Sequence, residues 1–226
     1  FGGAVISYSI SPTLPLGLNF NTTTGQISGT PTIASSTAFY TVTAMNSGGN
    51  ATFDVEITVN DLAPSVLSYN SPNVFTIGSS IVALNPSVSG TVISYSIVPS
   101  LPSGLDFNSA TGQISGTPSV ISSTSIYTVT ATNSGGSTTF DVQITINDMA
   151  PNALSYSTPN VFTIGSSIAS LNPIVSGGAV ISYSISPTLP LGLNFNTTTG
   201  QISGTLTAVS SVATYTVTAT NSGGST

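Results

Sequence analysis

The chain has 226 residues and contains no Lys, Arg, His, Cys or Trp, so its net charge of −6 comes entirely from Asp and Glu. Without cations it cannot replace the counterions of nucleic-acid phosphates, and without Cys it forms neither disulfides nor thiolate metal sites. The absence of Lys also excludes Lys–Asn isopeptide crosslinks. Nucleophilic catalysis by Ser or Thr is disfavoured, because neither His nor Lys is present to activate a hydroxyl.

The distribution of apolar residues favours a folded chain. Hydrophobic residues make up 39% of the sequence, and Val, Ile, Leu, Tyr and Phe recur regularly along it. Disorder would require a lower hydrophobicity and a higher net charge. No stretch approaches the roughly 18 consecutive apolar residues of a membrane-spanning helix. The sequence opens in the middle of a repeating pattern and without a signal peptide, so we expect it to be a piece of a longer protein.

Self-comparison reveals three repeats. The hexapeptide Gly-Gln-Ile-Ser-Gly-Thr begins at Gly25, Gly112 and Gly200, which are 87 and then 88 residues apart. Residues 2–30 are identical to residues 177–205, which points to a recent duplication. A period of this length is too long for a helical or leucine-rich solenoid, and it suits a small independent domain. We therefore predict three units, at residues 1–61, 62–148 and 149–226.

Only the middle unit is complete, and its turn signals divide it into short strands. Ile93, Tyr95 and Ile97 alternate with Ser and predict one buried face. Residues 84–90 are expected to be a loop or an irregular edge. Strands are predicted in chain order at residues 66–69, 74–77, 92–97, 105–107, 113–115, 126–132 and 139–146. About seven short strands with no helical period indicate an all-β protein built from β-sandwiches.

One predicted strand resembles strand F of immunoglobulin domains. It reads Tyr-x-Val-x-Ala-x-Asn from Tyr127 to Asn133, with Val129 where immunoglobulins carry a Cys. The resemblance implies that the inter-sheet disulfide is replaced by apolar packing. It also implies that Tyr127 forms the tyrosine-corner hydrogen bond. An Asn-Ser-Gly-Gly turn follows, whose residues tolerate positive φ.

The wider pattern, clearest from Tyr95 to Gly136, is similar to the bacterial "putative-immunoglobulin" repeat, a relative of cadherin-like and dystroglycan-type domains. This resemblance implies tandem immunoglobulin-like β-sandwiches in a large exported bacterial protein. Runs of such units resemble the stalks of giant surface adhesins in Bacteroidetes, and the gliding-motility adhesins of flavobacteria are the nearest type.

The junctions between units carry the candidate metal site. The motif Asn-Asp-x-Ala-Pro begins at Asn60-Asp61 and again at Asn147-Asp148. It resembles the cadherin junction, which implies Ca²⁺ bound at these four residues. Ca²⁺ takes about six to eight oxygen ligands, however, and the companion acidic motifs of cadherins are missing. The alternative is a Pro-stiffened linker, with no cofactor, in which Asp or Asn caps the last strand.

Three other groups of residues could carry chemistry, and each has a simpler structural explanation. Asp54 and Glu56, two apart on one strand face, lack the opposed geometry that glycoside hydrolysis needs and suit a solvated face. Sequons for N-glycosylation begin at Asn21, Asn50 and Asn196, and in a bacterial protein they usually carry no sugar. Exposed aromatic residues could bind sugars, but the alternation places Tyr8, Tyr95 and Tyr183 in the core.

The sequence therefore predicts a non-enzymatic structural segment of an extracellular, cell-surface adhesin or stalk. Its partners would be neighbouring repeats of the same chain, with surface glycans or other copies of itself as further candidates. Two alternatives stay open, namely a carbohydrate-binding module and a self-assembling filament subunit with strand pairing between chains. The second is suggested by the first unit, which lacks the two strands before the counterpart of Val92, and by the third, which stops before its last strand.

Overall fold

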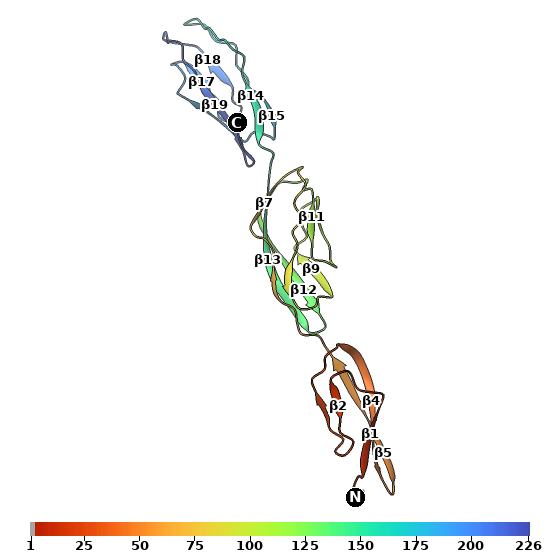
Figure 1. Ribbon diagram of the computed structural model, residues 1–226. Coiled ribbons are helices and arrows are strands. Elements are labelled where there is room, and N and C mark those ends of the chain that lie inside the picture. The colour runs from red at the N-terminus through yellow and green to blue at the C-terminus, as the bar shows by residue number, and fades with distance from the viewer. Residues whose placement is uncertain (1–2) are drawn as a thin grey trace.

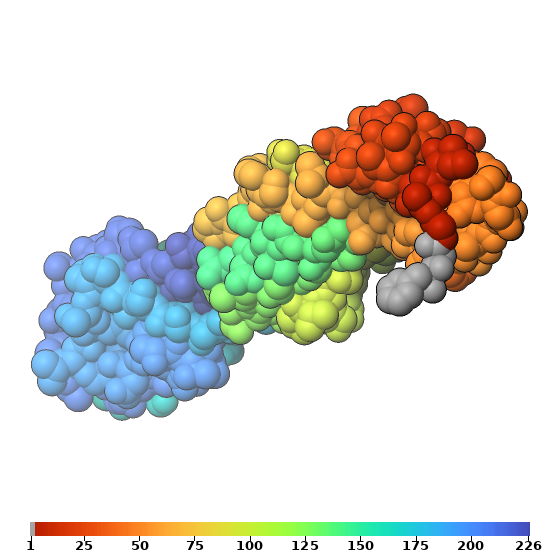
Figure 2. Space-filling view, turned by 90° about the horizontal axis from the view of Figure 1, so that it is seen from below, coloured from red at the N-terminus to blue at the C-terminus, as the bar shows by residue number. Residues whose placement is uncertain are grey.

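The computed structural model describes residues 3–226, and every regular element in that range is a β-strand. Figure 1 shows three groups of strands that follow one another along the chain, and Figure 2 shows the same three bodies in a row. The all-β prediction is confirmed. Residues 1 and 2 of the predicted first unit lie outside the described range. Within residues 3–226, no helix is long and apolar enough to cross a membrane.

The predicted unit at residues 62–148, called unit 2 below, contains the fullest set of strands. These are β6 (Ser65–Ser68), β7 (Asn73–Thr76), β8 (Ser87–Ser89), β9 (Ser94–Val98), β10 (Leu105–Phe107), β11 (Ile114–Gly116), β12 (Ser122–Asn133) and β13 (Gly136–Asn147).

Units 1 and 3 contain subsets of the same strands. Unit 1 has β1 (Ser7–Ser11), β2 (Leu18–Phe20), β3 (Ile27–Gly29), β4 (Ser35–Asn46) and β5 (Gly49–Val59). Unit 3 has β14 (Pro151–Ser155), β15 (Ile174–Gly177), β16 (Ser182–Ser186), β17 (Leu193–Phe195), β18 (Ile202–Gly204), β19 (Thr216–Asn221) and β20 (Gly224–Ser225).

The main sheet of unit 2 is built around a long hairpin. Its strand order is β7-β13-β12-β9, in which β12 pairs antiparallel with β13 and β9, whereas β7 runs parallel to β13. The hairpin closes at Asn133 and Gly136, so the Asn-Ser-Gly-Gly sequence forms its turn. Two smaller sheets, β6-β8 and β10-β11, complete the unit.

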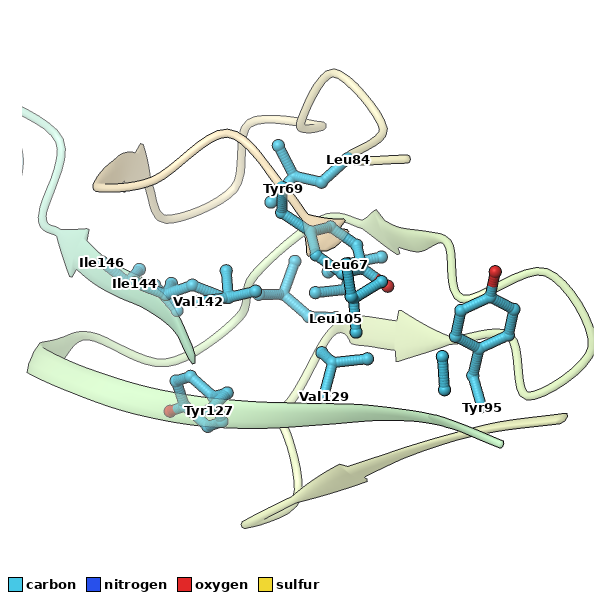
Figure 3. Packing of buried hydrophobic residues seen from close by; sticks show 12 residues of the cluster. Leu67, Tyr69, Leu84, Tyr95, Leu105, Tyr127, Val129, Val142, Ile144 and Ile146 are labelled. Atoms are coloured by element: carbon cyan, nitrogen blue, oxygen red, sulfur yellow. The ribbon is translucent and has the colours of Figure 1, made fainter. Parts of the chain in front are cut away.

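The core of unit 2 lies between the main sheet and the smaller ones (Figure 3). Strand β13 has the alternation expected of a strand with one buried face. Val142, Ile144 and Ile146 are fully buried, whereas Asp141, on the opposite face of the same strand, is exposed. Val129 of β12 and Ile114 of β11 are fully buried in the same cluster. As predicted, Val129 packs among apolar side chains at the position where immunoglobulins carry a disulfide Cys.

Two predictions for unit 2 are wrong. Ile93 is 67% exposed, because β9 begins only at Ser94 and Ile93 lies beyond the covered part of the sheet. The tyrosine-corner bond is not made by Tyr127 in the described residues, although its ring is buried. Instead the Tyr69 hydroxyl, just after β6, donates to the Gly112 carbonyl at 2.6 Å. The segment 84–90 also holds a short strand, β8.

Candidate functional site at the junctions between units

The turn between β12 and β13 holds the chain where it enters unit 2. The buried Asn133 amide donates to the Leu62 carbonyl at 2.6 Å and to the Thr91 carbonyl at 3.0 Å. Its Oδ1 atom accepts from the Gly135 N–H at 2.8 Å. One side chain thereby satisfies both of its donor hydrogens and an acceptor position, as a buried amide requires. It joins the junction to its own turn and to residue 91.

Ser134 and Gly135 complete this contact. The Asp61 N–H donates to Ser134 Oγ at 2.9 Å, and the Ser134 hydroxyl donates to a carboxylate oxygen of Asp61 at 3.1 Å. A Cβ atom added at Gly135 would overlap the Asp61 carbonyl oxygen. Gly135 is therefore required by the close approach of the junction backbone, rather than by the conformation of the turn.

The second junction repeats these contacts on unit 3. Asn221 is buried and donates to the Met149 carbonyl at 2.6 Å and to the Ala179 carbonyl at 3.1 Å. The Asp148 N–H donates to Ser222 Oγ at 3.0 Å. A Cβ at Gly223 would overlap the Asp148 carbonyl oxygen. Because both junctions use equivalent residues in the same way, we call this arrangement the junction cradle: the Asn-Ser-Gly turn with the Asp-x-Ala segment that it holds.

The cradle leaves almost no free chain between neighbouring units. Strand β13 ends at Asn147, and the next residue, Asp148, already donates to the cradle of unit 3. Strand β5 ends at Val59, so Asn60 alone separates it from Asp61. Each junction is thus bound to the unit that follows it. The arrangement can fix the direction in which one unit enters the next.

The structure gives the predicted metal ligands other partners. Asp61 accepts from Ser134, and a carboxylate oxygen of Asp148 accepts from the Met149 N–H at 2.8 Å. In the described residues no group of three or more Asp, Glu, His or Cys side chains comes together. One carboxylate per junction does not fit the oxygen-rich shell that Ca²⁺ requires. Asn60 and Asn147 make no side-chain hydrogen bond in this part of the chain.

The carboxylates, sequon asparagines and tyrosines that could carry chemistry occupy the positions that a purely structural role predicts. Asp54 and Glu56 are exposed on β5, and Asp54 accepts from the Thr41 hydroxyl at 2.7 Å. The sequon residue Asn21 caps its own turn by accepting from Thr23 and Thr24, and Asn196 does the same from Thr198 and Thr199. Tyr95 and Tyr183 are buried, and Tyr8 is half-buried, so these rings form no exposed sugar platform.

Sequence reasoning recognised both partners of the cradle but not the contact between them. It read Asn-Ser-Gly-Gly as a turn and Asn-Asp-x-Ala-Pro as a linker, whereas Asn133 and Leu62 are 71 residues apart in the chain. The available signal was that the two motifs recur together.

Comparison with known proteins assigns the fold and family. A fragment of three immunoglobulin domains from the titin I-band superposes with a TM-score of 0.50 at 11% identity, covering 97% of this chain and 83% of that one. A mutated variant of that fragment has the same TM-score at 10% identity. These likenesses concern the fold alone, and they confirm tandem immunoglobulin-like domains.

The chain is also similar to proteins named serine-rich adhesin for platelets. The one from Staphylococcus aureus strain MRSA252 is 36% identical over 144 residues, which cover 61% of this chain and 10% of that protein. The one from strain USA300 is 36% identical over 143 residues, covering 6% of that protein. The chain thus spans a tenth or less of the length of these relatives.

The sequence model of one domain family matches the chain three times in succession, at residues 2–60, 56–147 and 149–226. The matches cover nearly all of the chain and follow its three repeats. The chain therefore belongs to the immunoglobulin-like family described as Putative Ig domain.

Proposed function

We propose that this chain is a non-enzymatic segment of a bacterial cell-surface adhesin, in which tandem immunoglobulin-like units form an extended stalk. The junction cradle is the observation that carries the proposal. Units 2 and 3 each bind the backbone that leads into them, through Asn133 and Ser134 in unit 2 and through their counterparts in unit 3. A stalk needs this property, because free linkers between units would let the array collapse on itself.

The relatives and the composition support the same proposal. The relatives named above are adhesins, and the proposal extends adhesion at the cell surface from them to this chain. The chain has no Lys or Arg, so trypsin-like proteases find no cleavage site in it. Resistance of this kind suits a protein that works outside the cell.

The test is the shape of the purified chain in solution. Sedimentation velocity and small-angle X-ray scattering should show an elongated monomer, and its maximum dimension should increase by a constant step for each unit added. A chain with the four residues Gly-Ser-Gly-Ser inserted after Asn60 is the matched control, because it keeps all three units and loosens the junction between units 1 and 2. A compact particle, or a maximum dimension that the insertion leaves unchanged, would contradict the proposal.

The finer predictions need their own assays. Gliding motility stays a prediction, to be tested by deleting these repeats in a gliding host and measuring cell movement. Glycan binding also stays a prediction, and a glycan array without any saturable signal would remove it. The buried Tyr95 and Tyr183 rings do not favour it.

A further inference from the structure

Unit 2 has a hollow on its surface beside β6, β7 and the segment that leads into β8. Its volume is about 540 Å³, and it is lined by residues 68–70, 73, 75, 82–85 and 87. All of these residues come from unit 2, and none of them belongs to a junction cradle. The hollow is therefore a property of unit 2 by itself.

One part of the lining is apolar. Tyr69 and Leu84 belong to the core cluster, and Figure 3 shows them together at one edge of it. Phe75 of β7 packs against the same cluster and is half-buried, whereas the side chain of Val82 is 88% exposed. Aromatic rings have an electron-rich face, against which the weakly positive C–H groups of a ligand pack favourably. This wall suits a ligand that presents C–H groups.

The other part of the lining is polar, and two of its asparagines are held in place. The Asn73 amide donates to the Asn70 carbonyl at 2.8 Å and to the Gln143 carbonyl at 3.4 Å, and its Oδ1 accepts no hydrogen bond from residues 3–226. Asn85 Oδ1 accepts from Gln113 Nε2 at 2.8 Å, while its amide makes a single long backbone contact of 3.5 Å. The hollow thus offers one anchored acceptor and one anchored donor.

The same anchoring recurs in unit 3. The Asn160 amide donates to the Ser157 carbonyl at 2.7 Å, and Asn172 Oδ1 accepts from Gln201 Nε2 at 2.9 Å. These asparagines are the counterparts of the two in unit 2. Both units therefore fix the two amides by bonds within the fold, and groups that are fixed beforehand lose less entropy when a ligand binds.

We propose that the hollow of unit 2 binds a neutral oligosaccharide. None of its lining residues carries a charge, so an ionic ligand would find no ion pair there, and the net charge of −6 would repel an anion. A sugar presents C–H groups to the apolar wall. Its hydroxyls both donate and accept, which matches the free groups of Asn73 and Asn85. The buried Tyr95 and Tyr183 rings take no part.

The size of the hollow sets the length of the ligand. A volume of about 540 Å³ lies within the usual range for small-molecule sites and suits a ligand of about two or three sugar rings. The inference rests on the proposed adhesin function, to which it adds a class of ligand.

Ser87 offers a substitution that fills the hollow without disturbing the fold. Its counterpart in unit 3 is Ile174, and each pairs with a serine in the first strand of its unit, Ser68 and Ser155 respectively. Ser87→Ile therefore introduces a side chain that this position already carries elsewhere in the chain. Ser89→Ile is the matched control, because Ser89 is exposed on the same strand but does not line the hollow.

Saturation-transfer NMR of the whole chain tests the proposal. The probes are four neutral trisaccharides, namely maltotriose, cellotriose, mannotriose and triacetylchitotriose, with trigalacturonate as the charged comparison. We expect saturable transfer to at least one neutral trisaccharide and none to trigalacturonate. Ser87→Ile should weaken this binding at least about tenfold, with circular dichroism and melting temperature unchanged, and Ser89→Ile should leave it as it is.

The proposal fails if none of the four trisaccharides binds or if trigalacturonate binds equally well. It also fails if Ser87→Ile leaves the binding unaltered, or if Ser89→Ile weakens it to the same extent. None of these results bears on the elongated shape of the chain in solution, which is measured without sugar. A compact particle that still binds a trisaccharide through the hollow would contradict the stalk alone, so the two proposals fail separately.

Discussion

Asn133 and Asn221 are the residues on which the junctions depend. Each is the last residue of the strand before the turn, where the short amide reaches two backbone carbonyls and one backbone N–H. Asp at this position would keep only the acceptor, and it would set a negative charge against two carbonyl oxygens. Gln would carry the same groups on a longer and more mobile stem. The demand for two donors and an acceptor in one small buried space thus selects Asn.

Replacing Asn133 by Ala should destabilise unit 2 strongly. The Leu62 and Thr91 carbonyls and the Gly135 N–H would lose their partner in a partly buried place. Since each buried unsatisfied group costs about 1–3 kcal/mol, we expect the free energy of unfolding to fall by roughly 2–4 kcal/mol. Denaturation with guanidinium, followed by tyrosine fluorescence, measures this loss. Asn70→Ala, at an exposed position, is the matched control and should cost almost nothing.

Tyr156 should make the stability of unit 3 depend on pH in the alkaline range. Burial, and to a lesser extent the neighbouring Tyr183, raise the pKa of its hydroxyl to about 12, from 10.0 for an unperturbed tyrosine. The hydroxyl also donates to the Gly200 carbonyl at 2.5 Å, a bond that ionisation would remove. The unfolded chain therefore loses this proton first. The stabilisation is complete below pH 10 and is lost as the pH rises from 10 towards 12.

Melting temperatures measured from pH 6 to pH 12 check this expectation. With no His or Lys in the sequence, we expect a plateau up to about pH 9, followed by a fall. Tyr156→Phe should lower the plateau, because the hydrogen bond is lost, and it should flatten the alkaline fall of unit 3. An unchanged alkaline fall in Tyr156→Phe would assign the pH dependence to other groups. Burial raises the pKa of Tyr69 in the same direction in unit 2.

At the scale of the element, the first strand after each junction is irregular in the same way. Val66 in β6 has φ of 55° and Ala153 in β14 has φ of 50°, both in the left-handed region. The pairing register shifts at the same places, between Ser65 and Ser68 and between Asn152 and Ser155. The side chain of Val66 is 76% exposed, so no burial compensates for this backbone conformation. A β-branched residue is poorly suited to it.

Val66→Asn should therefore stabilise unit 2. Asn tolerates the left-handed region, which costs other L-residues about 1–2 kcal/mol, so we expect a gain of about 1 kcal/mol in the free energy of unfolding. Differential scanning calorimetry would register this as a higher melting temperature. Val66→Thr keeps the branched Cβ and should give no gain. A gain of equal size from Thr would mean that polarity, rather than backbone conformation, is responsible.

The strands could be predicted from the sequence wherever apolar and polar residues alternate along a strand whose inner face is covered by a second sheet. Strand β13 follows this rule through Val142, Ile144 and Ile146, and so does Tyr95 in β9. Ile93 does not, because alternation says nothing about where the covering layer ends. The roles of Tyr69 and Asn133 were missed for another reason. Each bonds to a residue more than 40 positions away, and local patterns carry no information about such pairs.

For the whole molecule, we expect no dependence of stability on calcium. Each junction offers a single carboxylate, Asp61 or Asp148, and its oxygens are partly engaged by neighbouring donors. The melting temperature should thus stay the same when EDTA is added, and also when CaCl₂ is then added in excess over the EDTA. MgCl₂ at the same ionic strength is the control for general screening. A rise of several degrees with Ca²⁺, lost in Asp61→Asn, would restore the cadherin-type site.

The parallel pairing of β7 with β13 has a mechanical consequence for a stalk under tension. Asn73 to Thr76 lie beside Ile144 to Asn147 and run in the same direction. When the two ends of unit 2 are pulled apart, β7 is drawn one way along this pair and β13 the other. The force acts along the strands, so the hydrogen bonds between them share the load and must break together instead of opening one after another. The β7–β13 pair is thus loaded in shear, and unit 2 should resist stretching better than a unit whose terminal strands open one hydrogen bond at a time.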